Sequence, residues 1–399
     1  MLQRSDRANA ISASPTLAID AKTKALMASG VDIVNLSVGE PDFPTPERAS
    51  LAAIAAITGN FTKYTAVGGI VELRRGIAEK LWKDNQLQYD PEEIIVSAGA
   101  KQSLYNIFMM ILNPGDEVVL PSPYWVSYPE QIKLCGGVPI LVRTDESTGF
   151  KITPERLREA FSAKTKAVLI NSPGNPTGAV YTPDEIRALA GVIEEYPVYV
   201  VSDEIYEQLI YGVEHYSIAR YSDTLRARSF VVNGFSKTHA MTGWRVGYVA
   251  GPRDLVGTMA SFQSHTTANP SSISQKAALA ALGTFDIHTR DEFRKRRDFV
   301  LAQIEQWPGL SCPRPDGAFY IFPNAGSLVG SFLRRQDGRR DRIDSVDHLC
   351  ELLLSEAHVS VVPGTGFGAP DNFRISYATS MTNLQTAMQR ISSFLARLE

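Results

Sequence analysis

Residues 229–250 read SFVVNGFSKTHAMTGWRVGYVA, in which two short apolar runs enclose a polar segment with a single lysine, Lys237. The runs 229–233 and 246–250 lack polar–apolar alternation, which is typical of strands in a sheet buried on both faces. A lysine close to a strand end can enter a crevice at the carboxyl edge of such a sheet. Partly desolvated there, its amine loses a proton more easily and can attack a carbonyl carbon.

Five further apolar runs precede this stretch, and helical patterns separate most of them. Candidate strands are expected at residues 94–96, 117–120, 138–142, 167–171 and 198–202. Residues 101–112 carry apolar side chains at helical spacing, and residues 183–195 form another candidate helix. Strands that alternate with helices predict an α/β fold, here a large domain with a mostly parallel, seven-stranded sheet between helices.

After Phe285 the regular alternation of apolar strands and helices ends. A long, charged helix is expected at 291–306, a second at 346–354 and a third at 381–398, with strands at 318–322, 359–362 and 373–377. We predict a smaller α+β domain made of residues 291–399 together with 1–45, because the segment before Pro46 is too short to fold alone. The large domain then spans 46–290.

Charge and composition narrow the class of protein. The chain has 399 residues, 44% of them hydrophobic, and a formal net charge of −3, which favours a packed core and no nucleic-acid partner. Three separated cysteines without a CxxC pair argue against disulfides and zinc. The first fifteen residues lack an apolar signal region, and the longest apolar run is much shorter than the ~20 residues of a membrane helix. A soluble, cytoplasmic protein without a membrane partner is expected.

The Arg- and Gly-rich stretch 333–342 has two interpretations. It could bind an anion. A solvated surface loop is favoured, because blocks of charge are usually solvated.

A second chemical motif is VYVVSDEIY at residues 198–206, an apolar strand that ends in Asp203, with Tyr206 three residues later. A buried carboxylate requires a partner. A protonated pyridine nitrogen would be one, and enzymes that use pyridoxal 5′-phosphate (PLP) recurrently place an acidic group there. Tyr206 could donate a hydrogen bond to the 3′-oxygen of that ring. The structural alternative is an aspartate N-cap beside a core tyrosine.

Three other segments have the chemistry of a phosphate or ring contact. Ser236 and Arg245 could bind a phosphate, the arginine through a bidentate pair. In SAGAKQ, residues 97–102, small residues precede a helix N-terminus, which attracts phosphate. The turn NSPGNPTG at 171–178 would hold Asn175 rigidly. Each segment has an ordinary structural alternative. Lys237, beside Ser236, could be a surface lysine, residues 97–102 could be a strand–helix turn that binds nothing, and residues 171–178 could be a plain turn.

Together these motifs resemble the signature of the fold-type I, class I/II aminotransferases. It is carried by NSPGNPTG at 171–178, SDEIY at 202–206, SK at 236–237 and TGWRVG at 242–247. Five further segments resemble the bacterial aspartate aminotransferase subgroup called I-gamma. They are VGEPDF at 38–43, TKYT at 62–65, SPYWVSYP at 122–129, GAFY at 317–320 and VVPGT at 361–365. The similarity runs from about residue 14 to the C-terminus.

The resemblance implies PLP as cofactor and assigns roles around it. Lys237 carries the cofactor as a Schiff base and then moves the α-proton. Asp203 pairs with the pyridine nitrogen, while Tyr206 and Asn175 hydrogen-bond the 3′-oxygen. The phosphate is surrounded by a further set of residues, namely Gly99, Ala100, Lys101, Ser236, Arg245 and, from a partner subunit, Tyr64. The last contact implies a homodimer with shared active sites.

Substrate contacts follow from the same resemblance. Arg374 grips the α-carboxylate with its planar fork, Asn175 also touches it, Gly39 lies over the substrate and Trp125 stacks on the cofactor ring. The α-carboxylate is common to all substrates, so specificity requires a second group. Lys101 stands where the subgroup holds the distal carboxylate of a dicarboxylic substrate. It could instead only support the phosphate or point to solvent.

The implied reaction is ping-pong transfer of an amino group between an L-amino acid and a 2-oxo acid, with L-aspartate and 2-oxoglutarate as the leading pair. Members that accept prephenate carry a basic residue four positions before the threonine of a Pro-Ser-Ala-Thr-like segment. In the comparable segment, residues 12–16, that place holds Ser12. This argues against prephenate without excluding it.

Other functions remain as alternatives. An aminotransferase of alanine, aromatic, methionine or kynurenine specificity shares every catalytic residue, and a PLP-dependent C–S lyase shares the fold. A transcription regulator would need a DNA-binding domain, for which there is no room before residue 14, and the acidic charge also argues against it. A non-catalytic binder would not need the intact set of Lys237, Asp203, Tyr206 and Arg245.

Overall fold

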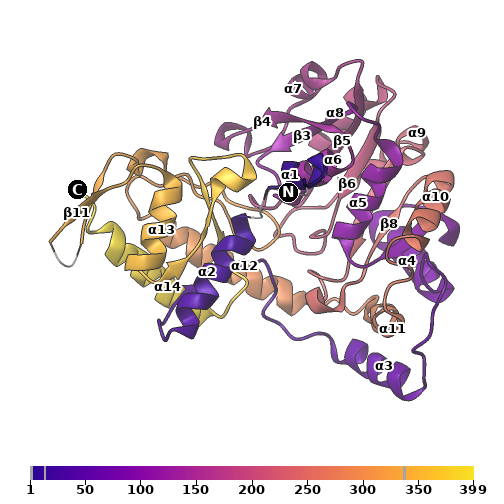
Figure 1. Ribbon diagram of the computed structural model, residues 1–399, viewed down its shortest axis with the longest axis horizontal. Helices are drawn as coiled ribbons and strands as arrows, with labels where there is room; N and C mark the ends of the chain where they lie inside the picture. The colour runs from indigo at the N-terminus through magenta and orange to yellow at the C-terminus, as the bar shows by residue number, and fades with distance from the viewer. Residues whose placement is uncertain (1–2, 13–14, 336–337) are drawn as a thin grey trace.

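A seven-stranded sheet forms the centre of the larger part of the protein, seen in the computed structural model, which describes residues 3–12, 15–335 and 338–399 (Figure 1). The strand order is β2-β8-β7-β6-β5-β3-β4. The strands are β2 (Ile94–Ser97), β3 (Glu117–Ser122), β4 (Val138–Arg143), β5 (Thr165–Asn171), β6 (Tyr199–Asp203), β7 (Ser229–Gly234) and β8 (Gly247–Ala250). Only β8 runs antiparallel to its neighbours, β2 and β7. The expectation of an α/β fold with a mostly parallel sheet is confirmed.

Helices cover both faces of this sheet (Figure 1). The helices of this larger part are α3 (Glu47–Thr58), α4 (Val71–Asn85), α5 (Ala100–Ile111), α6 (Ser127–Leu134), α7 (Pro154–Ala160), α8 (Pro183–Glu194), α9 (Asp223–Arg226), α10 (Arg253–Ser264) and α11 (Ser272–Ala281). Helix α3 lies away from the sheet, beside α11 (Figure 1). Short 3-10 turns also occur in the chain: η1 (Pro91–Glu93), η2 (Glu146–Thr148), η3 (Ile218–Arg220), η4 (Thr242–Trp244), η5 (Gly326–Leu328) and η6 (Gly364–Phe367).

The core explains why the strands are apolar without alternation. In β3, Val118 packs with Leu104 of α5, whereas its neighbour Val119 enters a separate cluster with Leu189 of α8 on the other face. Both faces of the sheet are therefore buried. Each fully buried Val or Leu contributes roughly 1.5–3 kcal/mol to the free energy of folding. Helix α8 begins at a capping box in which Thr182 and Glu185 each accept a hydrogen bond from the other's backbone N–H.

The smaller part consists of helices and short strands. Its helices are α12 (Ile287–Ile304), α13 (Val346–Glu356) and α14 (Met381–Leu395). An antiparallel sheet has the order β13-β14-β9, made of β9 (Tyr320–Ile321), β13 (Val362–Pro363) and β14 (Phe373–Ser376). The strand expected at 359–362 is divided, because β12 (Val359–Ser360) pairs with β1 (Val34–Asn35) in another sheet. The helix expected at 291–306 starts four residues earlier, where Asp286 caps it.

The N-terminal segment contacts both parts. Helix α2 (Pro15–Ala28) packs against β12 and β13, whereas α1 (Asp6–Ala10) lies beside α6 (Figure 1). The backbone N–H of Ser12 donates to Glu130 of α6 at 3.0 Å. The domain limits 46–290, and 1–45 with 291–399, remain a prediction.

The stretch 333–342 contains a hairpin of β10 (Phe332–Arg334) and β11 (Arg340–Arg342), with residues 336–337 outside the described chain. Arg335 pairs with Asp341, and Arg340 with Glu399. In the described ranges no helix is long and apolar enough to cross a membrane.

Candidate active site

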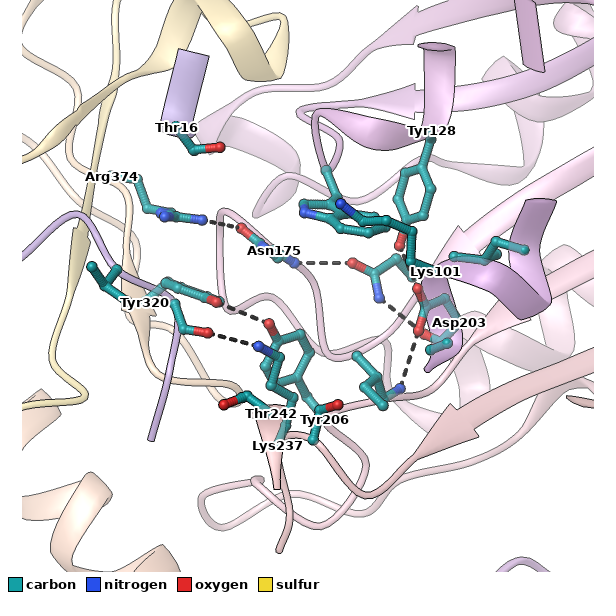
Figure 2. A pocket seen from close by; sticks show the side chains of 18 of the residues that line it. Thr16, Lys101, Tyr128, Asn175, Asp203, Tyr206, Lys237, Thr242, Tyr320 and Arg374 are labelled. Atoms are coloured by element: carbon teal, nitrogen blue, oxygen red, sulfur yellow. Dashed lines mark hydrogen bonds between the residues drawn. The ribbon is translucent and has the colours of Figure 1, made fainter. Parts of the chain in front are cut away.

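A cavity of about 380 Å³ opens where the parallel strands end, between the large sheet and the smaller part of the molecule. Most of the predicted site residues line it: Gly39, Ala100, Lys101, Trp125, Asn175, Asp203, Tyr206, Ser236, Lys237, Arg245 and Arg374. They come together because β5, β6 and β7 are parallel, so their carboxyl ends meet at one edge. In Figure 2, Arg374 lies on one side of the cavity and Lys101 and Asp203 on the other, with Asn175 between them.

Lys237 lies just beyond the end of β7 and is partly buried. Its ammonium nitrogen donates to the backbone oxygen of Gly39 at 2.6 Å (Figure 2). Burial lowers the pKa of Lys237 to about 8, and the positive charge of Arg374 adds to that effect. Near neutral pH the amine is therefore much closer to deprotonation than an exposed lysine.

Asp203 ends β6 and is almost fully buried. Its Oδ2 accepts from the Tyr128 hydroxyl at 2.8 Å, and its Oδ1 accepts from the backbone N–H of Ile205 at 3.2 Å. Burial raises the pKa of Asp203 to about 6, although both hydrogen bonds oppose the rise. The carboxylate has no cationic hydrogen-bond partner among the described residues, and it faces the cavity, where a protonated ring nitrogen would complete it.

Arg374, on β14, is 3% exposed and holds a fixed orientation. Its Nη1 donates to Asn175 Oδ1 at 2.9 Å and its Nη2 to the backbone oxygen of Ser37 at 2.7 Å. Its Nε is buried with no hydrogen-bond partner among the described residues. Asn175 is itself held by Asn171, whose Oδ1 accepts from the Asn175 backbone N–H at 3.0 Å. An arginine fixed in this way and lining the cavity is oriented in advance for an incoming carboxylate.

Arg245 and the start of α5 form a compact positive corner. Gly99 precedes α5 with φ of 91°, and a Cβ on it would lie 2.3 Å from Arg245 Nη2. Only glycine allows the guanidinium to approach this helix N-terminus so closely. Gly99 itself is not among the cavity-lining residues, but Ala100 and Lys101 of the first turn are. Helix N–H groups beside an arginine are suited to a phosphate.

Lys101 lies over the Trp125 ring, with its ammonium 4.8 Å from the ring centroid. Burial lowers the pKa of Lys101, and Arg245 lowers it further. No carboxylate in the described part of the chain pairs with this ammonium. A cation that lines a cavity without a carboxylate partner is suited to an anionic group on a substrate.

Besides Gly99, Tyr64 is the predicted site residue that does not line the cavity of the single chain. It is 91% exposed and lies between α3 and α4. Its side chain therefore has no role in the cavity of its own subunit.

Several cavity residues were missed by sequence reasoning. Tyr128 and Tyr320 stand within the quoted motifs SPYWVSYP and GAFY, so those motifs could have pointed to them. Thr16 and Asp20 line the cavity from α2, where no motif indicated them. Residues 13–14 of the segment compared for prephenate lie outside the described chain.

A buried carboxylate, a lysine of lowered pKa and an arginine cluster at the carboxyl edge of this seven-stranded sheet define the class: a fold-type I pyridoxal-phosphate aminotransferase. The sequence model described as "Aminotransferase class I and II" matches residues 31–391, and the chain belongs to this family.

Similar proteins are known along nearly the whole chain. It is 48% identical to the aspartate aminotransferase of Geobacillus stearothermophilus, with 98% of each chain covered. It is 43% identical to the aspartate/prephenate aminotransferase of Cereibacter sphaeroides, with 99% of each covered. Among solved structures, the aspartate aminotransferase from Rhizobium meliloti gives a TM-score of 0.95 at 42% identity over 100% of both chains. The aspartate aminotransferase from Thermus thermophilus with maleate gives 0.92 at 43% identity, covering 99% of this chain and 100% of that one.

Proposed function

We propose that this protein is an aspartate aminotransferase that uses PLP to convert L-aspartate and 2-oxoglutarate into oxaloacetate and L-glutamate. One observation carries the proposal: Arg374 and Lys101, two cations without a carboxylate partner among the described residues, line the same cavity as Lys237. Two separate cations suit a substrate with two carboxylates. The names of relatives at 46–48% identity support the same substrate.

The residues present fit PLP. Asp203 would hold the pyridine nitrogen, while Tyr206 and Asn175 would hydrogen-bond the 3′-oxygen. Ser236, Arg245 and the turn of Gly99, Ala100 and Lys101 would surround the phosphate, with Trp125 against the ring. The fit rests on two features of the site: Asp203 is buried without a cation, and a Cβ at Gly99 would close the corner beside Arg245. When bound, PLP supplies an electrophilic carbon and a ring that delocalises negative charge from the substrate Cα.

The chain's own groups perform the remaining steps. Arg374 and Asn175 fix the substrate α-carboxylate, and Lys101 attracts the distal one. The Lys237 amine would then accept the substrate α-proton and later release it. A pKa of about 8 suits that task, since the amine can both accept and release a proton near neutral pH. Gly39 accepts a hydrogen bond from the resting amine and lies over the substrate.

We further propose a cytoplasmic homodimer with shared active sites. Helix α3 projects from the body and lies beside α11 (Figure 1). Its outer face carries exposed Leu51, Ile54 and Ile57, and Tyr64 follows, 91% exposed. A second copy that covers this ridge would bury the apolar side chains and bring Tyr64 to the partner's cofactor phosphate.

Single half-reactions test the substrate. Purified protein loaded with PLP is mixed with one amino acid at a time, and the visible absorbance of the lysine-bound cofactor is followed. Aspartate and glutamate should each convert it to the pyridoxamine form. If an aromatic amino acid converts it and neither dicarboxylic one does, the specificity is wrong. Pyruvate and ammonia formed without a 2-oxo acid would instead reveal a lyase. Because position 12 holds serine and not a basic residue, we expect prephenate to convert little of the pyridoxamine form back to the lysine-bound form.

A further inference from the structure

Tyr320 contacts both the Tyr206 hydroxyl and the Arg374 guanidinium. It belongs to β9, is 1% exposed and lines the cavity. Its hydroxyl lies 2.9 Å from the hydroxyl of Tyr206, and its ring lies under the Arg374 guanidinium, 4.5 Å from centroid to Cζ. Figure 2 shows the line of contact from Tyr320 to Tyr206. One side chain therefore contacts both the expected 3′-oxygen donor and the α-carboxylate arginine.

The surroundings of Tyr320 leave its hydroxyl little freedom. A Cβ on Gly39 would lie 2.3 Å from Tyr320 Oη, so that glycine gives the hydroxyl its space. Tyr206 packs edge-on against the Tyr320 ring at 5.8 Å. The charged groups around this pair are Arg374 on β14, Lys237 after β7 and Asp203 on β6.

Charge decides which phenol donates. In a hydrogen bond between two hydroxyls, one O–H donates and the other oxygen accepts, and the more acidic phenol is the better donor. Arg374 lies directly over the Tyr320 ring and opposes the rise that burial causes in the pKa of Tyr320. Burial raises the pKa of Tyr206 well above its ordinary value and Tyr320 adds to that rise, while Arg374 opposes it there as well. The 2.9 Å contact allows either hydroxyl to donate. We assign the donor to Tyr320, because the Arg374 charge lies directly over its ring, and this assignment leaves the Tyr206 proton free to point into the cavity.

We propose that Tyr320 is a positioning residue: its hydroxyl directs the Tyr206 proton toward the cofactor 3′-oxygen, and its ring supports Arg374 in the α-carboxylate site. Substrate binding at Arg374 is thereby coupled to the hydrogen bond at the cofactor. The inference rests on the proposed function only in requiring PLP and an α-carboxylate in this cavity. It does not depend on which amino acid is preferred.

Two variants separate the two contacts. Tyr320→Phe removes the hydroxyl and keeps the ring, whereas Tyr320→Leu removes both. The matched control is Tyr377→Phe, because Tyr377 is another buried phenol whose hydroxyl donates at 3.1 Å to the backbone oxygen of Ala318, outside the cavity. For each PLP-loaded protein, the absorbance of the lysine-bound cofactor is titrated against pH. The dissociation constant for maleate, a dicarboxylate without an amino group, is measured by calorimetry.

In Tyr320→Phe the Tyr206 hydroxyl loses its donor and becomes a weaker donor itself. The titration midpoint should therefore rise by about half a pH unit, with maleate affinity changed less than about twofold. Tyr320→Leu should show the same rise and bind maleate about 5- to 10-fold more weakly, since the cation–π contact is lost. Tyr377→Phe should alter neither quantity. Circular dichroism confirms that each variant is folded.

An unchanged midpoint in Tyr320→Phe, or an equal rise in Tyr377→Phe, overturns the role of the hydroxyl. Equal maleate affinity in the Phe and Leu variants overturns the role of the ring. Failure of the proposed substrate looks different: the wild-type protein would show the absorbance titration and bind maleate, yet aspartate and glutamate would not convert it.

Discussion

The two sides of the cavity are built in different ways. On the sheet side, Asp203 ends strand β6, and Lys237 and Asn175 follow strands β7 and β5 within four residues, so the strand direction brings all three to one edge. On the opposite side, Arg374 and Tyr320 come from strands of four and two residues, and Thr16 from the first turn of α2. The sheet side is thus fixed by long parallel strands, and the opposite side by packing between separate segments.

This difference suggests a division of labour. The sheet side carries groups for the cofactor and the proton, which every substrate needs. The opposite side carries groups that are proposed to touch the substrate, and they come from short strands and a helix of separate segments. Variants on the sheet side should impair the reaction with any amino acid, and variants on the opposite side should impair substrate binding first.

The largest effect is expected for Lys237→Ala on the sheet side. Without this amine no group takes up the α-proton, and kcat should fall by about 10⁴- to 10⁶-fold with every amino acid. PLP should still bind, but without a covalent bond. Borohydride reduction followed by peptide mapping measures this: label should be found at Lys237 in the wild-type protein and at no lysine in the variant. Label on another lysine would contradict the assignment of Lys237 as the lysine that binds the cofactor.

Arg374→Leu tests the opposite side. The loss of a fixed guanidinium should lower kcat/KM by about 10²- to 10³-fold for all α-amino acids, mainly through KM. The visible absorbance of the bound cofactor should remain. If kcat falls as much as kcat/KM while KM is unchanged, the proposed division between the two sides is wrong.

Asp203→Asn predicts a pH-dependent change in stability of the cofactor-free protein. The folded pKa of Asp203, about 6, lies above the ordinary 3.8, so the folded state holds its proton more tightly and loses stability as the pH rises from 3.8 to 6. Above pH 6 this cost is about 3 kcal/mol at most. Cofactor-free Asp203→Asn should therefore be more stable than wild type at pH 7 and no more stable at pH 4. Urea unfolding at a fixed protein concentration measures both. With PLP bound, the order at pH 7 should reverse.

The sheet side was also the more predictable one. All seven strands were expected from apolar runs, because strands buried on both faces leave a continuous signal. Asp203 and Lys237 were found because each follows such a run directly. Asn175 was found because prolines and glycines fix its turn.

The opposite side gave weaker signals for a physical reason. Strand β9 has two residues and β12 ends after two, since Val361 passes from one small sheet to another, and such strands have no periodicity to read. Arg374 was named through a family resemblance. Asp20 was missed because an acidic residue on an exposed helix is ordinary in sequence, and only the packing of α2 brings it to the cavity. The Tyr128 bond to Asp203 joins distant segments and likewise has no local signal.

Lys101→Ser gives the smallest effect and the sharpest test, because Lys101 lies on the sheet side yet is proposed to bind substrate. Its ammonium is partly desolvated over Trp125, so an anionic distal group would gain a charge-assisted hydrogen bond there. Removing it should lower kcat/KM for aspartate and glutamate by about 10- to 100-fold and leave alanine and phenylalanine within about threefold. Steady-state kinetics with these four amino acids measure the ratio, and Lys133→Ser, on the exposed end of α6, serves as the control. A uniform loss for all four would mean that Lys101 serves the cofactor phosphate, and the division between the two sides of the cavity would then hold without exception.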